Sequence, residues 1–389
     1  MIDAQAPMPT PLRILAKLVI TPGLLVGLPV VGLLLSGNPL DPYLEFPPTT
    51  YHILHAPFSW SVFAFTGGID LILIGGLLFI ALPGKIQADS PERSLNRHGF
   101  PWWGWLGLFL LVSSWTLAWS RFSWFAELQT LTFTPLWLSF ILVINALTYR
   151  RVGHCLLLNR PGFFLSLFFL SALFWWYFEY LNRFVQSWHY IGIEDFTPTG
   201  YFLHSSIAFS TVLPAVLSTC EWFQTFPQAR TSRFHRPFAL PYPRQISLMV
   251  LAVASCSLFG IALWPDYLYP LLWVAPLLIM VSLQVLLGEE TLLAGVARGH
   301  WQVITVPAFA ALLCGIFWEM WNYYSAAKWG YSIPFVQRFE IFEMPILGYA
   351  GYLPFGLECV VAVDFVSRLW DPRKPSSPFL LNTSSSSIP

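Results

Sequence analysis

Long apolar runs separated by short polar connections constrain the fold of this chain more than any other feature. A helix rises about 1.5 Å per residue, so roughly 20 apolar residues cross the hydrocarbon core of a membrane. Ten runs reach or approach that length, at residues 12–35, 58–82, 100–120, 133–149, 161–185, 201–225, 246–264, 268–287, 303–326 and 345–366. The pattern predicts an all-α fold, a polytopic membrane helix bundle with about ten transmembrane helices.

The composition excludes a water-soluble fold of this length. The chain is 56% hydrophobic and only 10% charged, whereas a typical soluble domain is about 25% charged. The formal net charge is zero, so nothing favours nucleic acid as a partner. The partners that we expect are the membrane and a lipid or other apolar small molecule, with a protein partner as an open alternative.

The basic residues indicate how the spans are oriented. Of the 20 Lys and Arg residues, all but Arg121, Arg183, Lys328 and Arg338 lie on alternate flanks of successive spans. Basic residues accumulate on the cytoplasmic side of membrane proteins. We therefore expect a multi-pass protein of the bacterial inner membrane with both termini in the cytoplasm. Residues 12–35 are expected to be an uncleaved first helix.

A four-part motif occurs twice in the chain. Glu179 and Asn182 have the same spacing as Glu319 and Asn322. Each pair is followed by further matches, namely Trp188 with Trp329, Tyr190 with Tyr331, Leu213-Pro214 with Leu353-Pro354, and Glu221 with Glu358. The order predicts a tandem four-helix duplication. Because each unit has an even number of spans, both copies would share one orientation.

The duplication and the loops predict how the chain is divided. Residues 1–99 would form an N-terminal two-helix segment, 100–227 the first repeat and 246–370 the second. Residues 228–245 would be a basic cytoplasmic loop, and 371–389 a disordered cytoplasmic tail.

The duplicated glutamates are candidate catalytic residues. Glu179 and Asn182 share one helix face, and Glu319 and Asn322 share another. A carboxyl group near the bilayer centre costs about 3 kcal/mol even on a lenient scale, so we expect it to face the protein interior. We expect a neutral carboxylic acid that donates a hydrogen bond to the neighbouring carboxamide. Two interpretations stay open: hydrogen bonds that hold helices together, or a functional pocket.

Two more acids follow in the second copy. Glu343 stands directly before Met344-Pro345, where the returning helix is expected to begin. It could favour that helix N-terminus or complete an acidic cluster with Glu319 and Glu340. Glu358 would be a further proton donor or acceptor. The first copy has His204 near the position that Glu343 takes in the second.

The remaining candidates would bind the substrate. These are Asn182, Asn322, Trp188, Tyr190, Trp329, Tyr331, His204 and Asp70, the last near the middle of the second span. The histidines do not have the arrangement of a haem or metal site, and the five cysteines include no C-x-x-C pair. We expect neither a metal nor another cofactor.

The order W-x-Y, L-P, acid resembles the membrane-embedded lycopene cyclases of carotenoid biosynthesis. The matching residues are "WGY" (329–331) with "LPFGLE" (353–358), and "WHY" (188–190) with "LPAVLSTCE" (213–221). The chain has one acid four residues after Pro354, where that family has adjacent acids closer to the proline. The chain as a whole resembles a bacterial polytopic membrane protein.

Three functions are consistent with these features. The first is a lipid-phase enzyme, such as an isomerase or cyclase, that uses carboxylic acids for acid catalysis on an isoprenoid-like or other apolar substrate. Aromatic faces would stabilise the developing cation. The alternatives are a non-catalytic membrane subunit of a larger complex and a proton-coupled transporter.

Overall fold

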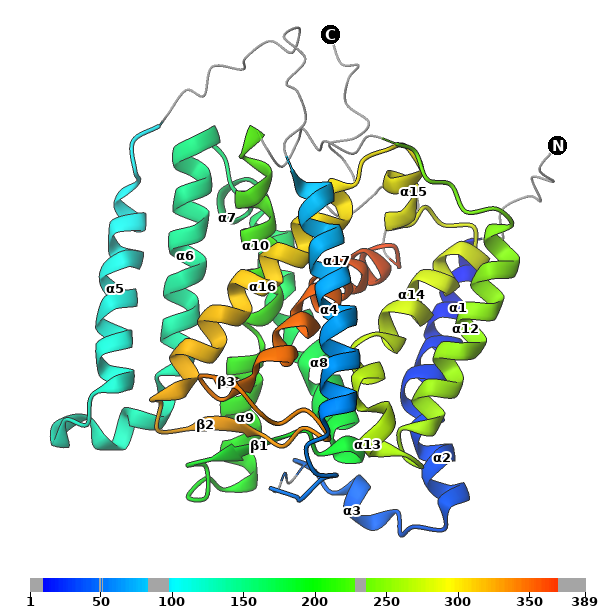
Figure 1. The fold of residues 1–389 in the computed structure, drawn as a ribbon. Coiled ribbons are helices and arrows are strands. Elements are labelled where there is room, and N and C mark those ends of the chain that lie inside the picture. Colours follow the sequence, from blue (N-terminus) through cyan, green and yellow to red (C-terminus); the bar gives the residue numbers. More distant parts are fainter. Residues whose placement is uncertain (1–9, 49, 51, 83–97, 228–235, 370–389) are drawn as a thin grey trace, which may run out of the picture.

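The structure is a computed structural model that describes residues 10–48, 50, 52–82, 98–227 and 236–369. These residues are mostly helical, with a few short strands (Figure 1). The prediction of an all-α fold is confirmed for them. The predicted tail, 371–389, and residues 228–235 of the basic loop lie outside the described residues.

The N-terminal segment contains two long helical stretches. Helix α1 (Thr10–Pro22), the π-helical turn η1 (Gly23–Gly27) and α2 (Leu28–Ser36) follow one another without a break, and α3 (Asp41–Leu44) and α4 (Trp60–Ala81) come next. Pro22 and Pro29 lie within the first stretch, where a wider π turn accommodates the missing N–H groups. None of the residues of α4 is buried, and this helix crosses the front of the molecule (Figure 1).

The predicted first repeat folds into helices joined by short connections. Its elements are α5 (Trp102–Trp119), η2 (Ser123–Leu131), α6 (Phe133–Val152), α7 (Leu156–Asn159), α8 (Pro161–Val185), β1 (Trp188–Ile191), α9 (Pro198–Phe209) and α10 (Val212–Gln224). Gly153 ends α6 in a left-handed conformation with φ of 76°, which glycine adopts without steric cost. Proline opens α8 and α9 within their first turns, where its missing N–H costs nothing.

The predicted second repeat has its long helices in a similar order. Its elements are α12 (Pro243–Gly260), α13 (Pro265–Leu268), η3 (Tyr269–Trp273), α14 (Ala275–Leu286), α15 (Leu292–Ala297), α16 (Gln302–Tyr323), β2 (Lys328–Tyr331), β3 (Glu340–Ile341), β4 (Met344–Pro345), η4 (Ile346–Gly351) and α17 (Tyr352–Ser367). Helix α13 is an addition, and β3, β4 and η4 stand where the first half has α9. Helices α5 and α12 have the same length, 18 residues. Glu343 does not precede a helix, because a small hairpin and a 3₁₀ turn come before α17.

Helices long and apolar enough to cross a membrane occupy eight of the ten predicted spans. A ninth span corresponds to the pair 265–273 and 275–286, which is bent by 51°. At the tenth, α5 is a regular helix of 18 residues that packs along α6 but is not among the eight candidate spans. The described residues therefore contain eight candidate spans, or nine with the bent pair.

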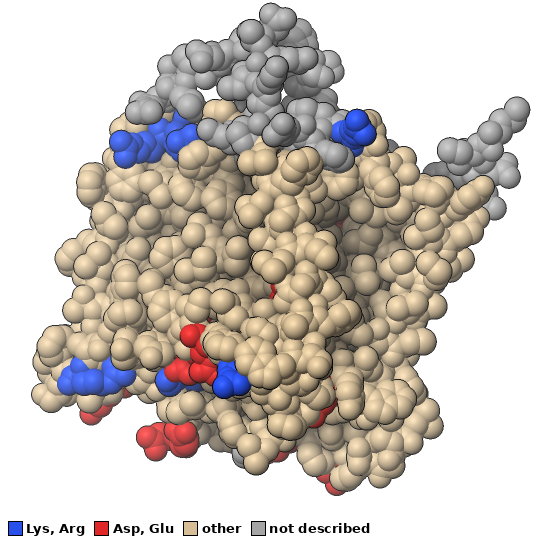
Figure 2. All heavy atoms as spheres, viewed as in Figure 1, with Lys and Arg blue, Asp and Glu red and all other residues tan. Residues whose placement is uncertain are grey.

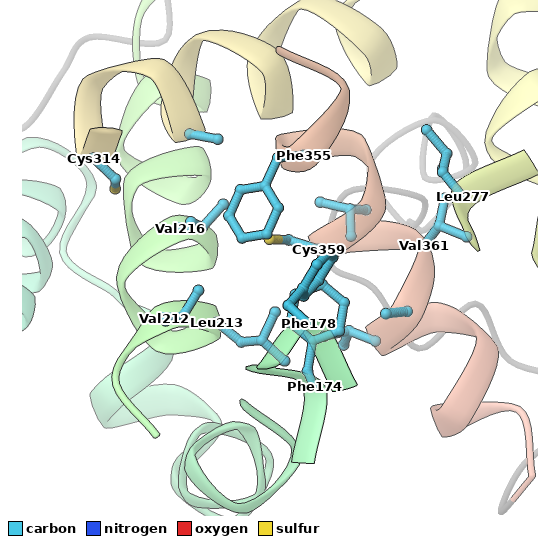
Figure 3. Packing of buried hydrophobic residues seen from close by; sticks show 14 of the residues in the cluster. Phe174, Phe178, Val212, Leu213, Val216, Leu277, Cys314, Phe355, Cys359 and Val361 are labelled. Atoms are coloured by element: carbon cyan, nitrogen blue, oxygen red, sulfur yellow. The ribbon is translucent and has the colours of Figure 1, made fainter. Parts of the chain in front are cut away.

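The helices of the two halves pack in the same pairs. Helix α5 packs on α6 as α12 packs on α14, and α8 packs on α10 as α16 packs on α17. Helix α10 also packs against α16, which joins the halves. In the core, Phe355 and Cys359 of α17 lie between Val216 of α10 and Phe178 of α8 (Figure 3).

Strands β1 and β2 pair across the two halves and define what we call the strand end of the molecule, at the bottom of Figure 1. The pairing is antiparallel, with Trp188 opposite Tyr331 and Tyr190 opposite Trp329. Each W-x-Y motif therefore faces the other in reversed order, which is the arrangement that a two-fold axis between them would produce.

Charged side chains gather at the two ends of the molecule. In the view of Figure 2 the band between the ends is almost free of them. Inside, Lys17 of α1 donates to the Phe365 carbonyl at 3.1 Å and pairs with Glu289 at 2.7 Å. Both side chains are buried. The hydrogen bond ties α1 to α17, and the ion pair ties α1 to the connection between α14 and α15.

Candidate functional site

Glu179 lies on α8, one and a half turns before the helix ends, and is completely buried. Its Oε1 accepts hydrogen bonds from the Trp175 indole at 3.0 Å, the Trp188 indole at 3.1 Å and the Tyr190 hydroxyl at 2.6 Å. Its Oε2 has no partner among the described residues. One carboxyl oxygen thus fixes the end of α8 to strand β1.

Glu319 has the same position on α16 and is also completely buried. Its Oε1 accepts from the Tyr331 and Tyr352 hydroxyls, both at 2.7 Å. The Trp329 indole donates to the Tyr331 oxygen at 2.9 Å. As in the first half, Oε2 has no partner in the part of the chain that the structure describes.

The two sites differ in the indole of the W-x-Y motif, which donates to Glu179 in the first half and to the Tyr331 oxygen in the second, and in the source of one further donor. Trp175 stands four residues before Glu179, and Gly315 takes that position before Glu319. A side chain at Gly315 would collide with Tyr352, since a Cβ there would lie 2.4 Å from the ring. The space that the indole fills in the first half is therefore filled in the second by a phenol from α17.

The tyrosines at both sites are neutral donors. Burial, and then the neighbouring glutamate, raise the pKa of Tyr190 and of Tyr331 well above the ordinary value. Both hydroxyls keep their protons at any physiological pH. They can donate to the glutamates and present polarisable faces to a bound molecule.

The asparagines bind the backbone, not the glutamates, and this corrects the expected hydrogen bond from acid to carboxamide. Asn182 donates to the Trp188 carbonyl at 2.8 Å and accepts from the Ser187 N–H at 2.9 Å. Asn322 donates to the Trp329 carbonyl at 2.7 Å and accepts from its N–H at 2.9 Å. A carboxamide matches one backbone N–H and one C=O at once, so each asparagine holds the chain as it leaves the helix.

A cavity of about 600 Å³ lies at the strand end, between the two halves and α4. Its size falls within the range of small-molecule pockets, roughly 300–1,000 Å³. Most of the lining side chains are apolar or aromatic. They include all four residues of the W-x-Y motifs, together with Trp175, Trp273, Trp318, Tyr352 and Phe355. Glu179 and Glu319 do not line the cavity; they lie behind the aromatic residues that do.

Three ionisable side chains other than tyrosine line the cavity: Asp70 from α4, His204 from α9 and Lys328 from β2. Asp70 is the only carboxylate among the lining residues. Lys328 pairs with Glu343 at 2.5 Å, and each of these side chains is 25% exposed. Glu343 therefore neutralises a lysine at the cavity wall. Of its two expected roles, the one at a helix N-terminus is wrong, because Glu343 lies between β3 and β4.

Glu358 lies on α17, one turn beyond Pro354 and Phe355, and does not line the cavity. Its side chain is completely buried and neither carboxyl oxygen has a partner among the described residues. The buried hydroxyl of Tyr177 on α8 also has no partner there. Glu221 is the residue of the first copy that corresponds to Glu358. It accepts a hydrogen bond from the Leu156 N–H at 2.8 Å.

The histidines near the strand end have separate roles. His55 contacts Asp266 at 2.6 Å and the Gln186 carbonyl at 3.2 Å. His52 and His189 meet edge to face, with ring centroids 5.1 Å apart. Within the described ranges, no three His, Cys, Asp or Glu side chains come together as the ligands of a metal would.

The sequence did not reveal three residues that shape the site. Tyr352, Tyr201 and Trp273 gave no signal beyond the general abundance of aromatic residues, and Trp273 lies inside the predicted span 268–287. Tyr352 could have been found as the residue directly before the duplicated L-P, where the first copy has Val212.

The comparison of this chain with known protein families, with curated proteins and with solved structures gives no match.

Proposed function

We propose that this chain is a multi-pass protein of the bacterial inner membrane with about ten crossings. The eight long apolar helices and the uncharged band between the two charged ends support this. Helices α8 and α16 run toward the strand end. Arg160, before α8, therefore lies at the other end, and Arg183 and Lys328 lie near the strands. Because Lys and Arg are in excess on the cytoplasmic side of membrane proteins, the strand end faces away from the cytoplasm. Both termini lie in the cytoplasm.

We also propose that the chain contains a tandem duplication. The similar order of the long helices, the matching helix pairs and the two buried glutamate sites support it. The exchange of donors offers a test. Trp175→Gly removes a donor from Glu179, and Val212→Tyr in the same chain adds a phenol at the position equivalent to Tyr352.

If the halves are equivalent, the double variant should regain stability that Trp175→Gly loses, because the new hydroxyl reaches Glu179. The measurement is the midpoint of unfolding in mixed micelles with increasing SDS. The proposed equivalence fails if Val212→Tyr lowers the stability of the Trp175→Gly variant by as much as it lowers the stability of the unmodified chain.

For the function, we propose a lipid-phase enzyme that acts by acid catalysis on an isoprenoid-like or other apolar substrate. The observation that carries the proposal is the apolar, aromatic cavity with a single carboxyl group, Asp70, in its wall. Asp70 takes the place of the glutamates as the acid that contacts the substrate. Glu179 and Glu319 hold the tyrosines and tryptophans that surround it.

In the proposed reaction, the Asp70 carboxylic acid gives its proton to one alkene carbon of the substrate, and the alkene π electrons form the new C–H bond, which leaves the positive charge on the other carbon. The positive charge that develops on carbon is stabilised by the faces of nearby indole and phenol rings. The Asp70 carboxylate then removes a proton from a neighbouring carbon, so the acid is regenerated and the substrate is isomerised or cyclised. The aromatic wall keeps water away from the cation.

The test is conversion of polyprenoid and carotenoid extracts by the reconstituted protein, followed by mass spectrometry and chromatography. We expect an isomeric product from the unmodified chain. Asp70→Asn should abolish it, because the amide cannot supply a proton. Glu127→Gln, which changes an exposed acid in η2 outside the cavity, is the matched control. Unchanged conversion by Asp70→Asn would refute the assigned role, and no conversion of any extract would refute the enzyme.

A further inference from the structure

One wall of the cavity is a single face of α9 that changes from polar to apolar along its length. Tyr201 and Ser205 are one helical turn apart and line the cavity, and Ala208, Phe209 and Val212 continue the same wall. Residues four apart share a helix face. The polar part is nearest the start of α9, toward the strand end (Figure 1).

The hydroxyl of Tyr201 is available for a ligand. Its side chain is 8% exposed and the hydroxyl makes no hydrogen bond within the described residues. Ser205, which is 7% exposed, stands one turn further along α9 and also lines the cavity. A buried hydroxyl without a partner costs free energy, so a bound group that accepts a hydrogen bond there would gain more than it does in water. His204, which stacks on Phe196, adds a third polar side chain to this part of the wall.

The polar part of the wall is uncharged apart from the imidazole of His204. Lys328 is the only Lys or Arg among the lining residues, and Glu343 already neutralises it. The cavity therefore has hydrogen-bond donors for a neutral oxygen but no free cation for a phosphate or carboxylate. Beyond Ser205, every lining residue of this wall is apolar.

From this arrangement we infer that the cavity binds a long apolar molecule with one uncharged oxygen at its end, such as an isoprenoid alcohol. The oxygen lies against Tyr201 and Ser205, and the hydrocarbon extends along Ala208, Phe209 and Val212. This inference rests on the proposed function, in that it requires the cavity to hold an apolar substrate. It adds the chemical class of the substrate and its direction in the site, with the oxygen toward the membrane surface.

The test uses the full chain in lipid nanodiscs and three tritiated probes: farnesol, the hydrocarbon farnesene, and farnesyl phosphate. Binding is measured by scintillation proximity, and the signal of empty nanodiscs is subtracted. We expect farnesol to bind roughly twofold to tenfold more tightly than farnesene, which is the factor that one uncharged hydrogen bond supplies. Tyr201→Phe should remove this preference and leave farnesene binding unchanged.

Tyr201→Phe deletes only a hydroxyl that makes no hydrogen bond to the described residues, so the fold should not suffer. Tyr267→Phe, at an exposed tyrosine outside the cavity, is the matched control and should leave the preference intact. Equal binding of farnesol and farnesene, or tighter binding of farnesyl phosphate, would overturn this inference while the apolar site stands. Absence of binding by all three probes would overturn the proposed function itself.

Discussion

Replacing Glu179 by leucine should destabilise the protein more than the same replacement of Glu319. Leucine has nearly the volume of glutamate but cannot accept a hydrogen bond. Glu179→Leu deprives three donors of their acceptor, two indole N–H groups and one hydroxyl. Glu319→Leu deprives two hydroxyls. The difference in the number of donors sets the order of the two effects.

The magnitude follows from the cost of a buried donor that loses its partner, about 1–3 kcal/mol. Three donors give a loss of about 3–9 kcal/mol for Glu179→Leu, and two give about 2–6 kcal/mol for Glu319→Leu. Glutamine retains the carbonyl acceptor and only places an amide where Oε2 has no partner. Each Glu→Gln variant should therefore lose less than its leucine counterpart, about 1–3 kcal/mol for the unsatisfied amide.

The assay is SDS-induced unfolding in mixed micelles, followed by tryptophan fluorescence and far-UV circular dichroism. Glu127→Leu, in the exposed turn η2, is the control and should change the free energy of unfolding by no more than about 0.5 kcal/mol. The reasoning would be refuted if Glu179→Leu unfolds at the same SDS fraction as the unmodified chain, or if Glu319→Leu is the less stable of the two.

Two further predictions concern close contacts and pH. A Cβ at Gly356 of α17 would lie 2.0 Å from the Pro307 carbonyl of α16, so Gly356→Val should prevent folding, judged by loss of the monodisperse peak in size-exclusion chromatography. Gly76→Val on α4, where nothing lies within 4 Å, should retain that peak. Burial, and then His52, lower the pKa of His189. The unfolded chain therefore binds the proton more readily, and stability should fall as the pH drops through the unfolded pKa near 6.5 toward the lower folded pKa. His189→Gln should flatten this part of the stability profile, and an unchanged slope would contradict the assignment.

The apolar runs predict the helices well because the length of a run is a property of the local sequence. Helices occur at each of the ten predicted runs, although the structure supports eight or nine candidate spans. The bent pair around Val274 and the turns before α17 could not be predicted, because they depend on how neighbouring helices pack. The cavity also could not be predicted from the sequence, because its walls come from elements that are far apart in the chain.

The candidate site was predicted in its residues more than in its contacts. The motif spacing selected Glu179 and Glu319, which are both buried and both accept a hydrogen bond from the tyrosine of the following W-x-Y motif. The same spacing predicted hydrogen bonds between these acids and the neighbouring asparagines. In the structure, Asn182 and Asn322 instead bind the backbone of the following strand. Helix spacing tells which side chains share a face, but not which of several donors fills a three-dimensional position.

The division between duplicated and unique residues indicates where chemistry is possible. The residues that occur in both halves, such as Glu179 with Tyr190 and Glu319 with Tyr331, form hydrogen bonds that fix both ends of the β1–β2 pair. A carboxylate with three donors on one oxygen is held too firmly to move a proton to a substrate that it does not touch. Asp70, in contrast, lines the cavity. It comes from α4, a helix that has no buried residues and lies outside both predicted repeats. We therefore propose that the repeated sites build the walls of the cavity and that Asp70, an acid from α4, is the residue that meets the substrate.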